Sequence, residues 1–147
     1  NLAEAFYRGP GSPPGPYLVG ALPVAVAGPH PDAGAFGLGV LWLAAAVLAT
    51  YLFGREVRGR AAGLLAATIV ACAPILNGQA HVPMVDLSLA ALVATSLWLV
   101  VRARGYVDRR ASVLLGLCCG IGMLMKQPFA AFLGLPLLIL AFFFQQT

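Results

Sequence analysis

Three ionisable side chains border long apolar segments and have the chemistry that a reaction or a binding site needs: His81, Asp86 and Lys126. A charge inside a bilayer costs about 2.5–3.5 kcal/mol at the centre of a span, so such groups mark candidate functional sites. The Asp86 carboxylate could orient a substrate or a nucleophile, or bind a metal ion. The Lys126 ammonium could bind an anionic group, such as a lipid phosphate, as a point charge. The His81 imidazole could serve as a metal ligand or a base.

Each of these residues also has a purely structural explanation. Asp86 falls where a helix is expected to start, and the helix dipole stabilises an acid there by about 0.3–1 kcal/mol. A lone Lys at the end of an apolar segment often anchors the helix at the membrane surface. A lone His in a polar turn is more often neither a ligand nor a base. Residue type alone therefore leaves both explanations open at all three positions.

The composition identifies the elements that must position these residues. The chain is 61% hydrophobic and 10% charged, with a mean hydropathy of +0.90, whereas soluble domains carry about 25% charged residues. Uncharged stretches long enough to cross a bilayer predict an all-α, polytopic membrane protein. The basic residues flank these stretches, which does not indicate nucleic-acid binding. The cysteines Cys72, Cys118 and Cys119 have neither metal-site nor disulfide-framework spacing.

Five apolar stretches predict about five transmembrane helices. They cover residues 34–53, 61–77, 83–101, 111–125 and 128–144. Residues 1–33 are rich in Pro and Gly, so we expect an outer-side loop with interfacial helices there, and a helical bundle over residues 34–147. Pro74 lies near the end of the second span, where a kink or an early stop is tolerated. Because the chain begins at Asn1 and ends just after an apolar run, we expect it to be a fragment of a larger single domain.

The positive charges predict the orientation of the bundle. Cytoplasmic loops of membrane proteins are enriched in Lys and Arg. We therefore expect both basic turns to be cytoplasmic, and alternation then places His81, Asp86, Lys126 and residues 1–33 on the opposite side. Seven of the nine Lys and Arg residues form these two turns: Arg55, Arg58 and Arg60 in one, and Arg102, Arg104, Arg109 and Arg110 in the other.

The order of four motifs resembles a known family. The motifs are residues 11–17 (GSPPGPY), 51–62 (YLFGREVRGRAA), 83–86 (PMVD) and 116–128 (GLCCGIGMLMKQP). Together they look like the amino-terminal half of glycosyltransferase family 39, the superfamily of protein O-mannosyltransferases and the aminoarabinose transferase that acts on lipid A. The resemblance implies a GT-C type helical fold, a polyprenyl-phosphate-linked sugar donor and inverting transfer to a lipid, protein or glycan acceptor.

The resemblance also implies roles for individual residues. Asp86 falls on the family's acidic position at the start of a span, with a supporting role in catalysis. Lys126 falls on a basic position near the donor phosphate, and His81 is a second candidate for binding it. The family's main catalytic acid lies in the first outer loop and has no match here, which implies that this chain starts downstream of it. Gln127 also departs from the pattern, because Gly commonly follows the basic residue.

The sequence therefore supports three hypotheses. The first is a glycosyltransferase of the bacterial inner membrane, with a sugar donor, an acceptor and the bilayer as partners and with no nucleic acid. No cofactor is implied with certainty, and a divalent metal is left open. The alternative is a transporter or permease, in which buried charges line a substrate path. The third is a membrane scaffold without chemistry, in which Asp86 and Lys126 point to lipid head groups.

Overall fold

The protein is helical throughout the residues that the structure describes. This computed structural model describes residues 21, 25, 31–81, 85–103 and 107–144. The predicted all-α fold is confirmed. The helices in this part of the chain are α3 (Pro31–Arg58), α4 (Arg60–Cys72), α5 (Pro74–Ala80), α6 (Val85–Ala103), α7 (Arg109–Met125) and α8 (Phe129–Phe144).

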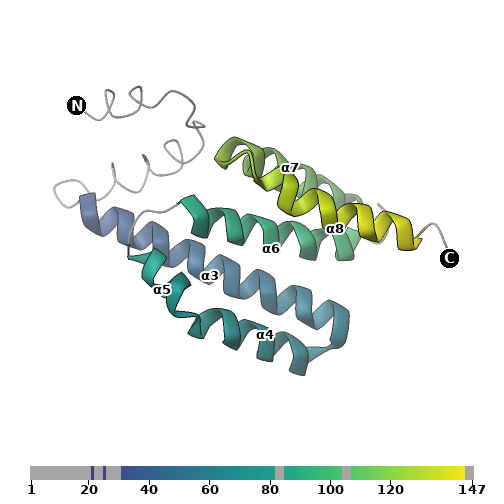
Figure 1. Ribbon diagram of the computed structural model, residues 1–147, viewed down its shortest axis with the longest axis horizontal. Coiled ribbons are helices and arrows are strands. Elements are labelled where there is room, and N and C mark those ends of the chain that lie inside the picture. The colour runs from purple at the N-terminus through teal and green to yellow at the C-terminus, as the bar shows by residue number, and fades with distance from the viewer. Residues whose placement is uncertain (1–20, 22–24, 26–30, 82–84, 104–106, 145–147) are drawn as a thin grey trace.

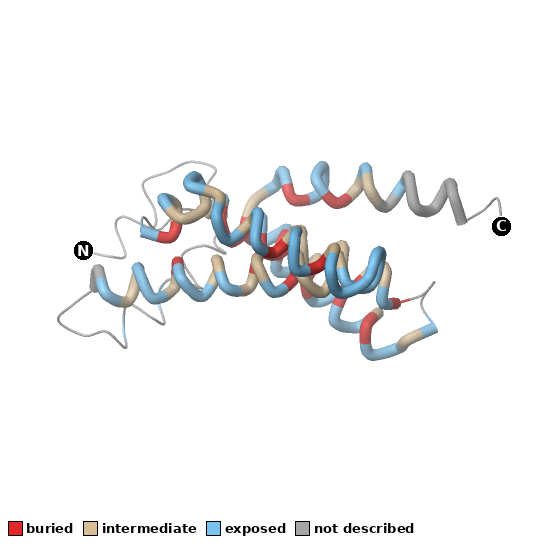
Figure 2. Tube along the Cα trace, turned by 90° about the horizontal axis from the view of Figure 1, so that it is seen from below, coloured by how far each residue is buried: buried red, intermediate tan, exposed pale blue. Residues whose placement is uncertain are grey.

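Helix α6 lies at the centre of the arrangement. It packs against α3 on one side and against α7 and α8 on the other, while α4 and α5 cover α3 (Figure 1). Buried residues face the neighbouring helices and exposed residues face outward along most of the chain (Figure 2). The exposed outer faces are themselves apolar, with residues such as Leu65, Ile69 and Leu117. An apolar exterior is what a lipid environment requires.

The described helices match the predicted spans closely, although not every helix is long enough to cross a bilayer by itself. Helices α3 and α6 qualify as spans by length and composition, and α4 with α5 qualifies as a third if the bent pair is one span. Helices α7 and α8 have 17 and 16 residues, whereas an upright span needs about 20. The total of about five spans stays a prediction, and the outer segment expected at residues 1–33 lies almost wholly outside the described residues.

The second predicted span is broken and longer than expected. Helix α4 ends at Cys72, Ala73 is extended, and α5 restarts at Pro74 with a bend of 60°. Proline favours this geometry because it pushes the preceding residue out of the helical region and is well suited to the first helical position. Helix α5 then continues to Ala80, so residues 78–80, which lie beyond the predicted span 61–77, are helical as well.

Close packing between α3 and α4 depends on glycine. Gly59 adopts φ 88°, a conformation that favours Gly, and makes the short turn between the two helices. Beyond the turn, a Cβ on Gly63 would overlap the backbone at Tyr51 and Arg55. The turn and the small residues therefore bring α4 directly against α3.

The core between α6 and α7 contains one buried polar contact. Ser96 is fully buried, and its hydroxyl donates to Cys118 Sγ at 3.2 Å. The Cys118 thiol in turn donates to the Leu92 carbonyl at 3.5 Å. Leu99 and Leu115 belong to the same core cluster. Because the Ser96 hydroxyl and the Cys118 thiol each have a partner, this contact links two helices without leaving either of these groups unsatisfied.

Candidate functional site

Helices α6 and α7 place Asp86 and Lys126 at the same end of the bundle. Asp86 lies in the first turn of α6, and Lys126 is the residue that ends α7. The two helices pack side by side and run in opposite directions (Figure 1). The start of one therefore lies next to the end of the other. Each charge also suits its position, since helix dipoles favour an acid at the start and a cation at the end.

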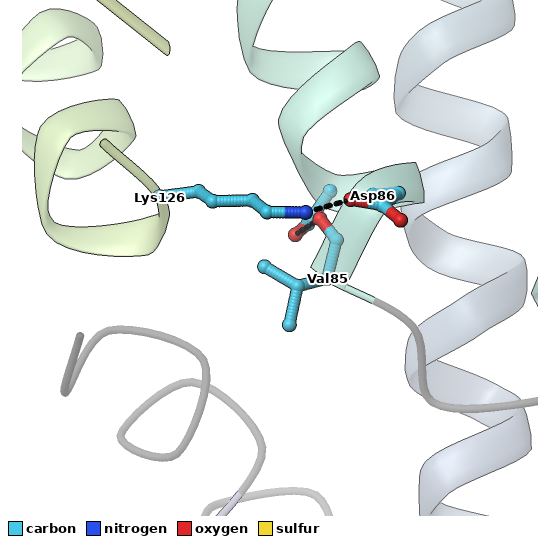
Figure 3. A network of polar contacts seen from close by, with 4 residues as sticks. Val85, Asp86 and Lys126 are labelled. Carbon is cyan, nitrogen blue, oxygen red and sulfur yellow. Dashed lines mark hydrogen bonds and ion pairs between the residues drawn. The ribbon is translucent and has the colours of Figure 1, made fainter. Parts of the chain in front are cut away.

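The two side chains are in direct contact. Lys126 Nζ donates a hydrogen bond to Asp86 Oδ1 at 2.5 Å, and Figure 3 shows the lysine reaching across from the turn after α7. The side chains are 40% and 52% exposed, respectively. The sequence predicts these residues on the same side of the membrane, and the structure brings them together as an ion pair. An exposed ion pair of this kind contributes about 0–1 kcal/mol to the free energy of folding, so the pair adds little to the stability of the protein.

The backbone of Lys126 is fixed by the packing around it. Its N–H donates to the Gly122 carbonyl at 3.2 Å, and its own carbonyl accepts from Phe129 N–H at 3.0 Å. Phe129 is 1% exposed, and its ring lies so close to Gly122 that a Cβ there would overlap it. Sequence reasoning missed Gly122 and Phe129, which have no polar group to draw attention. Together they hold the short turn from which the Lys126 side chain extends.

His81 is also placed by helix packing, but it does not join the ion pair within the described structure. It follows the last residue of α5, and its backbone N–H donates to the Gly78 carbonyl at 3.3 Å. Its exposed ring stacks on Phe36 of α3, with centroids 5.1 Å apart and an interplanar angle of 27°. The segment between His81 and α6, residues 82–84, lies outside the described residues.

The basic turns meet at the opposite end of the bundle. Arg102 of α6 forms an ion pair with Glu56 of α3 at 3.0 Å. The Arg102 guanidinium also lies 5.9 Å from the Trp98 ring centroid, and that of Arg55 lies 5.7 Å from the Tyr51 ring. Arg104 is outside the described residues. The predicted separation of the two basic turns from Asp86 and Lys126 is thus visible, although which end faces the cytoplasm stays a prediction.

The arrangement offers hydrogen-bond donors that an anion could use. An ammonium group has three N–H donors, and the Asp86 bond uses one of those on Lys126. That bond also holds the ammonium beside the first turn of α6, where the free backbone N–H groups of a helix favour negative charge. A metal ion fits less well, because the carboxylate already faces a cation. The described residues contain no group of three His, Cys, Asp or Glu that could hold a metal.

Comparison with known proteins adds one positive finding. The model of the family described as dolichyl-phosphate-mannose-protein mannosyltransferase matches residues 11–147. This range includes every described helix and both members of the ion pair. Neither a curated protein nor a solved structure matches the chain.

Proposed function

The chain belongs to the dolichyl-phosphate-mannose-protein mannosyltransferase family, and we propose that it transfers a sugar from a polyprenyl-phosphate donor to a hydroxyl acceptor. Membership makes it a membrane glycosyltransferase. The family match favours this hypothesis over the transporter and scaffold alternatives. The acceptor belongs to the lipid, protein or glycan class, and transfer takes place on the non-cytoplasmic side.

The proposed reaction is an inverting displacement. The acceptor hydroxyl oxygen attacks the anomeric carbon of the sugar and forms the new glycosidic bond. The bond between that carbon and the phosphate oxygen breaks, and its electron pair leaves with the polyprenyl phosphate. The hydroxyl proton passes to a base. Negative charge therefore grows on the leaving phosphate, where a fixed cation lowers the barrier most.

Lys126 is the cation that we assign to the leaving phosphate. Its contact with Asp86 carries the proposal, because it holds an exposed ammonium at the end of the bundle with two donors that make no bond among the described residues. The first turn of α6 adds backbone N–H groups at the same place. A phosphate oxygen that binds there would replace water around the ammonium while Asp86 keeps its bond.

Asp86 is assigned a positioning role. The Lys side chain is long and flexible, and a bond to a carboxylate at a helix start restricts where its ammonium lies. Because Asp86 Oδ1 already accepts from Lys126, we assign the proton-accepting role to a residue outside the described ones. We retain His81 as a second candidate for contacting the donor phosphate, since its ring is exposed on the residue that follows α5.

The basic end of the bundle is proposed to face the cytoplasm of a bacterial inner membrane. The described part of that end carries Arg55, Arg58, Arg60, Arg102, Arg109 and Arg110 against Glu56 and Asp108. Such an excess of Arg is typical of cytoplasmic turns. Asp86 and Lys126 then lie on the side where the donor sugar is presented.

A transfer assay tests this proposal. The complete protein would be placed in proteoliposomes with a radiolabelled polyprenyl-phosphate mannose donor, and transfer to added acceptors measured. We expect Lys126→Gln to lower the rate by roughly 100-fold, the loss typical of removing a group that stabilises developing charge. Glu56→Gln is the matched control, because it breaks an ion pair of α6 at the other end. Equal rates for wild type and Lys126→Gln would refute the assignment.

A further inference from the structure

The break between α4 and α5 leaves backbone carbonyls that a continuous helix would have satisfied. In an unbroken helix, the Ala71 carbonyl would accept from the N–H of residue 75 and the Cys72 carbonyl from that of residue 76. Instead, Leu76 N–H donates to the Ala73 carbonyl at 3.2 Å. Pro74 has no N–H to offer. An unpaired carbonyl in a lipid environment costs several kcal/mol, so the break needs replacement donors.

The side chain of Asn77 supplies a donor for one of these carbonyls, that of Ala71. Its Nδ2 group donates to the Ala71 carbonyl at 2.8 Å and to the Ala73 carbonyl at 3.0 Å. The first acceptor precedes the break and the second lies within it, whereas Asn77 itself belongs to α5. One amide group therefore ties the two helical segments together across the bend.

The bend directs the end of α5 onto α3. Ala80 is 4% exposed, and its backbone lies so close to Gly39 of α3 that a Cβ on this glycine would overlap the Ala80 carbonyl. The next residue, His81, stacks on Phe36 one turn earlier in α3. The chain then enters α6 at Val85, immediately before Asp86. Helix α5 also contacts α6 directly, so the direction of α5 bears on the region where α6 begins.

We propose that Asn77 is a positioning residue for the site, because its bridge across the α4–α5 break holds the segment that places His81 and the start of α6. The contribution of Asn77 to transfer rests on the proposed function, whereas its contribution to the geometry of α5 does not. The bridge acts only through its N–H donors. A side chain of similar size without such donors should therefore release α5, and one that keeps the amide should retain it.

A distance measurement tests the geometry without any assay of activity. Spin labels would be placed on the exposed positions Ile75 of α5 and Leu41 of α3, in the complete protein with its cysteines replaced. We expect Asn77→Leu to give a longer and broader distance distribution than wild type. Gln79→Leu, a neighbouring change in the same helix, should leave the distribution unchanged. An unchanged distribution in Asn77→Leu would overturn the proposal.

Kinetics test whether this geometry matters for the reaction. With rates expressed per folded molecule, we expect Asn77→Leu to lower kcat/KM for the donor by about tenfold, because a small misplacement of groups at a site slows the reaction. Asn77→Gln should recover part of this loss, and it replaces the leucine variant if that one does not fold. A purely structural role predicts less folded protein with unchanged kcat/KM. If the wild-type protein transfers no sugar, the proposed function is refuted. The distance measurement then decides by itself whether Asn77 positions α5.

Discussion

Lys126 Nζ and Asp86 Oδ1 are joined by a 2.5 Å hydrogen bond between residues 40 positions apart in the chain. The bond connects the residue that ends α7 to the first turn of α6. A second ion pair, Glu56 with Arg102, ties α6 to α3 at the other end of the bundle. Both pairs join α6 to a neighbour, but the first lies at the predicted donor side. The Glu56–Arg102 pair can therefore serve as the control in experiments on the Asp86–Lys126 pair.

Removing the charge of Asp86 should weaken transfer without unfolding the protein. In Asp86→Asn the side chain keeps its size but loses the attraction that fixes the Lys126 ammonium. We expect kcat/KM for the donor to fall about tenfold, because a misplaced ammonium stabilises the leaving phosphate less well. Steady-state kinetics in proteoliposomes would measure this. Glu56→Gln should retain wild-type kinetics, and an equal fall in both variants would show that the effect comes from loss of helix pairing.

The packing of Gly122 on Phe129 should be sensitive to a single methyl group. A Cβ at position 122 would overlap the Phe129 ring, and overpacking of this kind usually costs about 1–3 kcal/mol. We expect Gly122→Ala to lower the midpoint of unfolding in mixed detergent micelles. Gly120→Ala is the control, because a Cβ there meets nothing within 4 Å. Equal stability of the two variants would contradict the close contact.

The hydrogen bond from the buried Ser96 hydroxyl should contribute a small free energy to the pairing of α6 with α7. This bond to Cys118 connects α6 with α7, and such bonds between membrane helices average about 0.6 kcal/mol. A double-mutant cycle with Ser96→Ala and Cys118→Ala, measured by detergent unfolding, should give a coupling of that size. Thr95→Ala is the comparison, since Thr95 Oγ1 donates within its own helix to Ala91 O. A coupling of zero between positions 96 and 118 would argue against the bond.

Much of the fold could be predicted because it depends on local patterns. Apolar length defined the helices, and Pro74 indicated the break in the second span. The continuation of the helix over residues 78–80 could not be predicted in this way, because Asn77 next to Gly78 favours a turn. In the structure, Asn77 bonds across the break, and Ala80 docks on Gly39. Tertiary contacts of this kind outweigh local preference.

For the candidate site, the sequence predicts the end of the bundle where Asp86 and Lys126 lie, but not their direct contact. Alternation of the spans placed Asp86 and Lys126 at one end, because each lies at a helix terminus. Their direct bond depends on how α7 turns into α8, which Gly122 and Phe129 fix through apolar packing. His81 had been grouped with the pair on sequence grounds, yet its ring stacks on Phe36. A single sequence cannot indicate which aromatic ring a surface histidine will contact.

The proposed function requires Lys126 and Asp86 to lie on the non-cytoplasmic side of the membrane, and the accessibility of introduced cysteines in intact cells measures this. In a cysteine-free form of the complete protein, Gln127→Cys and Arg58→Cys would each be treated with a membrane-impermeant maleimide. Both positions are exposed in the structure. We expect the cysteine at position 127 to be labelled in intact cells and the one at position 58 only after the membrane is permeabilised. The reverse pattern would place the ion pair on the cytoplasmic side and refute the proposed function.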